Sequence, residues 1–373
     1  MERSWPLVVY KEEVMREGMQ IESADIPVAD KVRLLDELSE TGLKNIVVGS
    51  FVRPEYTPQM AQIEEVLKRF TPKPGVTYTA LLLNAKAAAR AREFSPPLTL
   101  DNEPPRLAAH LCDVFARRNI NRSAAQVRDS WPATVARAIE RGATGACVGA
   151  HAAWGSNFSG ARSVADVMAV LEDAGRLWAE AGIPVTSVYL GDPMSWNTPD
   201  RTAELIAAVK ERFPQVRRYV LHLHDARGMA LVSAYAALRA LEAADAVQLE
   251  GALGGIGGCP YCGNGRATGM MATEDVMHML DSMGIAHGVD LDLLVRAEWM
   301  LERMLGRPTM GHVSKAGPRP ATPDSWYDPN MPFVETFEQA RHFALGHGVY
   351  EGGRYPWKER IPAPPLSSTG AYP

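Results

Sequence analysis

The sequence has few cysteines and lacks any long apolar run. Four cysteines in 373 residues are too few for a disulfide framework in a chain of this length. The apolar run at residues 7–10 is too short for the core of a signal peptide. No other run approaches the roughly 20 residues of a membrane-spanning helix. We therefore expect a soluble, cytoplasmic protein that does not bind membranes.

Positive charge is also scarce. The 39 Lys and Arg residues are outnumbered by 44 Asp and Glu residues, which gives a net charge of −5, and no dense basic stripe occurs along the chain. Nucleic-acid-binding proteins usually carry such a stripe, so we expect no nucleic-acid partner. The hydrophobic content of 46% is ordinary for a globular protein.

Short apolar runs alternate with amphipathic helical patterns along most of the chain. Helices are predicted at residues 31–39, 134–139, 166–181 and 202–212. Buried strands are predicted at residues 7–10, 45–52, 76–83, 108–115, 144–150, 184–190, 218–224 and 246–252. Eight strands separated by helices favour a (β/α)₈ TIM barrel, with an open α/β sheet as the alternative.

Two regions interrupt this alternation. Residues 94–105 are rich in proline and are predicted to be an insertion before the fourth strand. Residues 317–373 are irregular and rich in Pro, Gly and aromatic residues, too aromatic for a disordered tail. We therefore divide the chain into a barrel at residues 1–316 and a C-terminal extension at residues 317–373, which we expect to pack on the barrel or on a partner subunit.

The strongest local signal for chemistry is the pair His222 and His224 at the end of the seventh predicted strand. Alternate residues of a strand point to the same face, so the two imidazoles project together at the end of the barrel where active sites lie. Such a pair is half of a metal site. Two hydrogen-bonded core histidines are an equally good interpretation of the pair alone.

Three weaker signals follow other predicted strands. Arg16 and Glu17 follow the first strand, where an acid can bind a metal, although a helix N-terminus with a surface arginine is the simpler interpretation. Asp192 follows the sixth strand, either at the rim or as a turn residue before proline. After the eighth strand, a glycine-dense loop carries Cys259, which is able to act as an acid or base. A redox dithiol of Cys259 and Cys262 is a minor alternative.

Taken together, these residues resemble 3-hydroxy-3-methylglutaryl-CoA (HMG-CoA) lyase and its wider family of metal-dependent barrel lyases, synthases and carboxyltransferases. The similarity covers residues 8–316 or so, and its motifs occur in order along the chain. They are Arg16-Glu17-Gly18-Met19-Gln20, Ser50-Phe51-Val52-Arg53-Pro54, residues 115–121, Leu190-Gly191-Asp192, His222-Leu223-His224-Asp225, residues 254–261 and Ala272-Thr273-Glu274-Asp275.

The resemblance implies a role for each matching residue. Glu17, His222 and His224 would bind a divalent cation, Mg²⁺ or Mn²⁺. Arg16 would stabilise enolate charge, Asp192 would lie at the substrate hydroxyl, and Cys259 would take part in proton transfer from the loop. The expected substrate-binding residues are Gln20, Asn84, Arg117 and Asn121, although the last two are equally compatible with a solvated surface. A homo-oligomer, most simply a dimer, is expected.

The chain departs from the family pattern at three positions. Glu17 stands where the metal-binding acid is normally Asp, Val47 where the lyase has a catalytic Glu, and Met270 where the last metal ligand is an Asn. Asn264 in the loop is a candidate replacement for that ligand. These changes leave metal chemistry plausible, so we expect a relative that acts on a different acid or acyl thioester.

Three functions remain open on the sequence. The first is a metal-dependent carbon–carbon lyase that cleaves a 3-hydroxy acid or acyl-CoA, not hydroxymethylglutaryl-CoA itself. The second is an acyl-CoA-dependent condensing synthase or carboxyltransferase, which the string Cys259-Pro260-Tyr261 disfavours. The third is a degenerate barrel without catalytic activity, for which Val47 and Met270 are the evidence.

Overall fold

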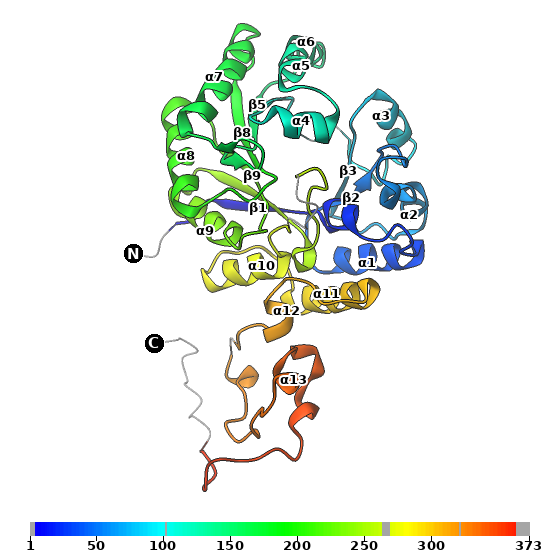
Figure 1. Cartoon of the computed structure of the whole chain (residues 1–373), viewed down its shortest axis with the longest axis vertical. Helices are drawn as coiled ribbons and strands as arrows, with labels where there is room; N and C mark the ends of the chain where they lie inside the picture. Colours follow the sequence, from blue (N-terminus) through cyan, green and yellow to red (C-terminus); the bar gives the residue numbers. More distant parts are fainter. Residues whose placement is uncertain (1–3, 101–102, 263–268, 321, 363–373) are drawn as a thin grey trace.

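Eight parallel strands form a curled sheet, the wall of a (β/α)₈ barrel, in the computed structural model of the chain (Figure 1). The structure describes residues 4–100, 103–262, 269–320 and 322–362. The strand order is β3-β2-β1-β10-β9-β8-β5-β4, so the first strand pairs with the last, and β3 and β4 are the two edges of the sheet. The strands are β1 (Leu7–Glu12), β2 (Asn45–Ser50), β3 (Thr77–Leu81), β4 (Arg106–His110), β5 (Ala146–His151), β8 (Val185–Asp192), β9 (Arg218–Leu223) and β10 (Ala246–Gly251). The predicted barrel is confirmed.

Helices cover the outside of this sheet (Figure 1). They are α1 (Val28–Glu40), α2 (Ile63–Arg69), α3 (Ala85–Arg92), α4 (Asp113–Ile120), α5 (Ala124–Asp129), α6 (Trp131–Glu140), α7 (Val164–Glu180), α8 (Pro199–Arg212), α9 (Ala230–Ala240), α10 (Thr273–Ser282), α11 (Leu291–Leu305) and α12 (Val313–Ala316). The small hairpin β6 (Gly155–Ser156) and β7 (Gly160–Ala161) follows β5. None of the helices among the described residues is long and apolar enough to cross a membrane.

The main hydrophobic core lies between the strands and the helices. Leu221 and Leu223 of β9 and Leu249 of β10 belong to it, together with Leu34 and Leu38 of α1. Because side chains alternate along a strand, the residues between these leucines point to the other face, into the barrel. The main core is therefore formed by the outer face of the sheet and the helices packed on it.

The inner face of the sheet is unusually polar. Register pairs Lys11 with Glu250 and Glu250 with His222, and farther around the wall it pairs His151 with His110. Barrel interiors are normally filled with branched aliphatic side chains. Here Cys147, Tyr189 and Val220 form a small cluster of buried hydrophobic residues that is separate from the main core.

The fourth strand differs from its prediction. An apolar run at residues 108–115 was expected to be one strand, but β4 ends at His110 and α4 begins at Asp113. Cys112 precedes the helix, and its sulfur accepts a hydrogen bond from Phe115 N at 3.4 Å. Apolar residues occur on both sides of the boundary, because the strand and the first helical turn are both partly buried, so hydropathy does not mark where the strand ends.

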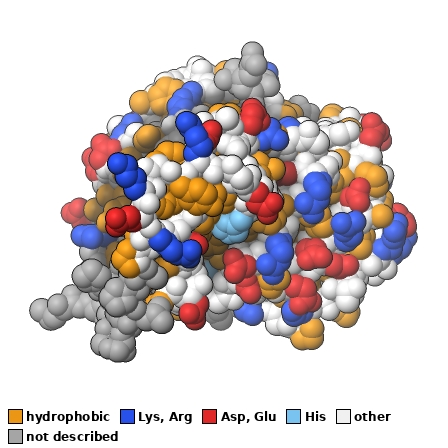
Figure 2. All heavy atoms as spheres, turned by 90° about the horizontal axis from the view of Figure 1, so that it is seen from below, with side chains coloured by type: hydrophobic (Ala, Val, Ile, Leu, Met, Phe, Trp, Pro, Cys, Tyr) orange, Lys and Arg blue, Asp and Glu red, His pale blue; other side chains and the backbone are white. Residues whose placement is uncertain are grey.

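The C-terminal extension forms an irregular lobe below the barrel (Figure 1). It contains the short helix α13 (Phe337–Ala340), and none of its described residues, 317–320 and 322–362, is buried. Two of its side chains contact α11: His342 Nε2 lies 2.9 Å from Oε2 of Glu302, and the centre of the Phe343 ring lies 6.0 Å from that of Trp299. Seen from this side, the surface carries many hydrophobic side chains (Figure 2).

Candidate active site

Three potential metal ligands converge at the C-terminal end of the barrel strands. Glu17 lies in the turn Val14–Gly18 after β1, His222 is on β9, and His224 directly follows that strand. One ligand atom from each residue lies within 4.8 Å of the others. The Nε2 atoms of the two histidines are 3.2 Å apart, and Glu17 Oε1 is 3.4 Å from His224 Nε2. The structure thus brings together the three residues expected to bind a metal.

The charge states of these groups suit a divalent cation. Burial alone would raise the pKa of Glu17, but the adjacent Arg16 guanidinium and the two imidazoles hold it well below its usual value. Burial lowers the pKa of His224, and the nearby Glu17 carboxylate does not fully offset this effect. An ionised carboxylate and a neutral imidazole are the forms that bind metals. The donor set of two imidazoles and one carboxylate therefore fits a divalent metal ion.

Arg16 is held beside this cluster by two acids. Its Nε donates to Glu13 Oε2 at 2.8 Å, and its terminal nitrogen forms an ion pair with Glu17. Burial opposes the charged guanidinium, but these two carboxylates outweigh that effect and raise the Arg16 pKa. A fixed positive charge at this point is suited to stabilising an anion that develops next to the ligands.

Asp192, the last residue of β8, is fully buried near His224. Its Oδ2 accepts hydrogen bonds from the backbone N and the side-chain Nδ2 of Asn197, at 2.6 and 2.7 Å. Its Oδ1 has no hydrogen-bond partner among the described residues. Burial raises the Asp192 pKa. Because buried polar atoms are normally satisfied, the free oxygen indicates a place for a ligand hydroxyl.

The glycine-dense loop after β10 lies against the site. A Cβ on Gly257 would lie 2.7 Å from Glu17 O, so only glycine lets the loop backbone pass this close to the metal ligand. Arg118 Nε donates to Tyr261 O at 2.8 Å, and the Cys262 thiol donates to Pro193 O at 2.9 Å. Cys259 is buried in a cluster with Cys262. Hydrogen bonds thus hold the loop against α4 and against the residue that follows β8.

The residues expected to bind substrate are spread more widely. Gln20 is half-buried in the turn Met19–Ile21. Asn84 caps the N-terminus of α3 and lines a cavity of about 560 Å³ with Arg53, Lys86 and Arg90.

The two predicted residues of α4 and its C-terminus, Arg117 and Asn121, lie away from the metal-ligand cluster. Arg117 is exposed and pairs with Asp113 at 2.7 Å, and Asn121 ends the helix in a left-handed conformation. Neither is joined to the metal ligands by a described contact, whereas Arg118 contacts the loop after β10. Asn264, the suggested replacement ligand, lies outside the described residues.

The departures from the family pattern can be located in the structure. Val47 is buried on β2 but separate from the main core, as expected for a side chain that faces the barrel interior. Met270 forms a bridge with His224, so it does lie beside a metal ligand. Its thioether is a poor ligand for Mg²⁺ or Mn²⁺, which prefer oxygen donors. Met270 therefore supplies no obvious fourth ligand.

Several polar residues of the interior were not identified from the sequence. Glu250 Oε2 lies 2.8 Å from His222 Nδ1. Tyr189 lies between His222 and His151, with ring-centre distances of 6.4 and 5.0 Å, and His151 stacks on His110 at 4.5 Å. The signal was available, because these residues alternate with apolar ones in the predicted strands.

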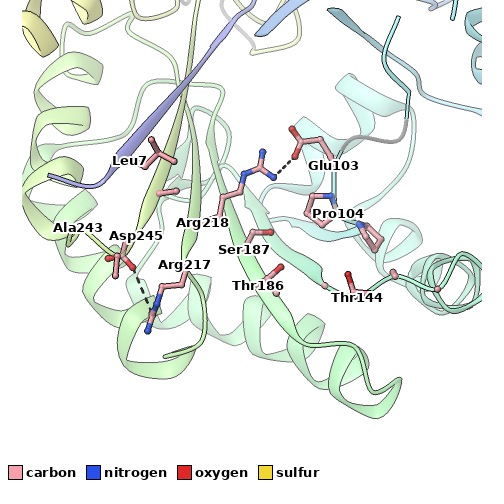
Figure 3. A pocket seen from close by; sticks show the side chains of 16 residues that line it. Leu7, Glu103, Pro104, Thr144, Thr186, Ser187, Arg217, Arg218, Ala243 and Asp245 are labelled. Carbon is pink, nitrogen blue, oxygen red and sulfur yellow. Dashed lines mark ion pairs between the residues drawn. The ribbon is translucent and has the colours of Figure 1, made fainter. Parts of the chain in front are cut away.

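A larger cavity, about 840 Å³, lies at the opposite end of the barrel (Figure 3). Arg218 and Glu103 form an ion pair of 2.8 Å in its wall, and Arg217 points toward Asp245. Active sites of such barrels lie at the C-terminal ends of the strands. This cavity is at their N-terminal ends, so we do not assign it to the active site.

Comparison with known proteins agrees with this geometry. Residues 10–301 match the HMGL-like family model. A 3-hydroxy-3-isohexenylglutaryl-CoA/hydroxymethylglutaryl-CoA lyase from Pseudomonas aeruginosa is 36% identical and covers 81% of this chain and 94% of its own length. An (R)-citramalyl-CoA lyase from Chloroflexus aurantiacus is 32% identical, covering 81% and 92%. The structure of an HMG-CoA lyase from Acinetobacter baumannii, in complex with coenzyme A and 3-methylmalate, has a TM-score of 0.67 at 28% identity, covering 83% and 95%. The chain belongs to the HMGL-like family.

Proposed function

We propose that the protein is a divalent-metal-dependent lyase that cleaves a carbon–carbon bond in a 3-hydroxy acid or its CoA thioester. The two curated relatives named above are lyases, and carbon–carbon lyase is the class to which we assign this chain. The observation that carries the proposal is the convergence of Glu17, His222 and His224 at the barrel mouth, with ligand atoms within 4.8 Å. A degenerate barrel has no reason to retain buried, charge-matched ligands.

The side chains around this point suit a retro-aldol cleavage. The ion, when bound, supplies a Lewis acid that polarises the oxygens of the substrate. Asp192 accepts the proton of the substrate hydroxyl, for which its raised pKa suits it. The carbon–carbon bond then breaks, and its electron pair moves into the neighbouring carbonyl as an enolate. Arg16 stabilises the enolate oxygen, and Cys259 returns a proton to the enolate carbon.

The cavity at the ends of β2 and β3 supports a CoA thioester over a free acid. Arg53, Lys86 and Arg90 bring three cations to its wall, although Arg90 also pairs with Glu64 at 2.7 Å. Clustered cations favour the phosphate groups of a nucleotide carrier.

The substrate we propose is not hydroxymethylglutaryl-CoA itself. Val47 stands where the resemblance places the family's catalytic glutamate, and the inner wall of this barrel also carries the stacked imidazoles of His110 and His151. The loss of the glutamate alters the shape and polarity of the barrel interior. A different substituent on the hydroxyl-bearing carbon would fit such a change.

The decisive experiment is an activity assay with purified protein and Mg²⁺ or Mn²⁺. The substrates are a panel of 3-hydroxyacyl-CoA thioesters, citramalyl-CoA and the matching free acids, with products identified by mass spectrometry. We expect one thioester to be cleaved into a shorter acyl-CoA and a carbonyl compound, and the His222→Ala variant to be inactive. Consumption of a keto acid that depends on acyl-CoA would instead establish a condensing synthase.

A further inference from the structure

His222 presents its two ring nitrogens to different partners. Nε2 faces His224 Nε2 at 3.2 Å, within the group of metal ligands, whereas Nδ1 lies 2.8 Å from Glu250 Oε2. Glu250 is the register partner of His222 on the neighbouring strand β10. The contact is therefore fixed by the backbone of the barrel wall and not by a flexible loop.

The Glu250 carboxylate is itself held in place by two residues of the barrel interior. Gln248 Nε2 donates to its Oε1 at 2.7 Å, and Lys11 Nζ lies 3.4 Å from the same oxygen. Both Glu250 oxygens are thus engaged, one by His222 and one by Gln248 and Lys11. A carboxylate whose two oxygens both have partners has little freedom to rotate.

The ionic contacts continue toward the opposite end of the barrel. Lys11 Nζ also donates to Glu103 Oε1 at 3.1 Å. Glu103 in turn pairs with Arg218 in the wall of the cavity at the N-terminal ends of the strands (Figure 3). Negative and positive groups alternate along this path. Each buried charge therefore has a partner of opposite sign, which offsets the cost of burying it.

We propose that Glu250 is a positioning residue that fixes His222 for metal binding. The inference rests on the metal site of the proposed function. A neutral imidazole carries one N–H, and an acceptor at Nδ1 leaves the lone pair of Nε2 free for the ion. Carboxylates that accept this N–H orient the ring and strengthen it as a ligand, and their removal typically weakens metal binding by about 10–100-fold. Glu250 therefore sets the affinity without touching the ion.

The test is a titration of the metal-free, full-length protein with Mn²⁺, followed by the electron paramagnetic resonance signal of the free ion. We expect Glu250→Gln to weaken binding by about 10–100-fold, and Glu250→Asp to recover part of the loss. Glu103→Gln is the matched control, because it removes a carboxylate of the same path that does not touch His222. We expect it to change the affinity by less than about twofold.

A second measurement needs no variant. Long-range ¹⁵N NMR spectra of the wild-type protein without metal report which nitrogen of His222 carries the proton, and we expect Nδ1. With the neutral ring, a proton on Nε2 instead of Nδ1 would overturn the inference, as would equal affinities for wild type and Glu250→Gln or an equal loss in Glu103→Gln. If the wild type binds no Mn²⁺ at all, the proposed function fails instead.

Discussion

The Nε2 atoms of His222 and His224 lie 3.2 Å apart in the barrel mouth. Two imidazolium ions at this distance would repel each other strongly, so at most one of the two rings takes up a second proton and becomes charged. Burial opposes the charged form of His222, but its contact with Glu250 outweighs that effect and raises its pKa, whereas burial lowers the pKa of His224. The first proton taken up in acid therefore goes to His222.

This order predicts how metal binding depends on pH. A metal must displace the proton from His222, so the affinity for Mn²⁺ should be constant above the raised pKa of His222 and fall below it. One displaced proton gives a fall of about tenfold per pH unit. Titrations between about pH 5 and 8 measure this slope, and an affinity that stays level across the range would contradict it.

The ligand set itself is tested by substitution. His222→Ala and Glu17→Gln should each weaken Mn²⁺ binding by more than the 10–100-fold or so that is typical of losing a residue that only orients a ligand. Glu17→Asp keeps the charge and restores the acid usual in the family, so it should bind more tightly than Glu17→Gln. Calorimetric titration measures all three. Equal binding by Glu17→Gln and wild type would remove Glu17 from the ligand set.

A close backbone approach near α12 should make one glycine irreplaceable. A Cβ on Gly311 would collide with Oε1 of Glu274, a buried side chain whose Oε2 already accepts a hydrogen bond from Gly254 N at 3.0 Å. We expect Gly311→Ala to lower the free energy of unfolding by about 1–3 kcal/mol, measured by urea denaturation. Gly348→Ala is the control, because a Cβ at Gly348 meets no atom within 4 Å.

Lys315 should make stability sensitive to acid. Burial alone would raise the pKa of Glu302, but the contact with Lys315 Nζ at 2.8 Å and the bonds from Thr309 lower it to about 2. Because the folded pKa lies below the usual 4.5, this contribution is complete above about pH 4.5 and is lost as the pH falls toward 2. Lys315→Met should reduce this part of the acid dependence in unfolding experiments. An unchanged pH profile would show that the pair contributes nothing.

The C-terminal lobe should support either activity or assembly. Its described residues include Phe337, which is 78% exposed, and other exposed aromatics. A protein truncated after Pro320 should have lower activity or a different oligomer size by light scattering, and Phe337→Ser should shift the oligomer in the same direction. Ile139→Ser, at an exposed position on α6, should not. A truncated protein identical to the full chain in both measurements would refute the idea.

Local patterns in the sequence were enough to predict the barrel and the common face of His222 and His224, whereas Glu17 was assigned to the same cluster through the family resemblance. Each predicted strand is a short apolar run, and two of the three ligands belong to one strand, where alternation alone places His222 and His224 on the same face. Glu250 could not be placed in this way. Its contact with His222 depends on the register of β10 against β9, which is set by strand pairing in the curled sheet and not by residues close in sequence.

The individual contacts of the C-terminal lobe could not be predicted, for a different reason. Its contacts with α11 come from His342 and Phe343, two residues in an irregular segment with no period to reveal which side chains face the barrel. Sequence spacing predicts where a side chain points only when the backbone follows a helical or an extended repeat, and this segment follows neither.

The placement of the hydrophobic core outside the sheet has a consequence for how this enzyme can change. The aliphatic contacts that hold the fold together lie between strands and helices, while the lumen is lined by ionic and imidazole groups. Side chains inside the barrel can therefore change during evolution while the packing between strands and helices is kept. Each buried charge that is introduced there needs a partner of opposite charge. Substrate preference and structural integrity are in this way assigned to opposite sides of the same eight strands.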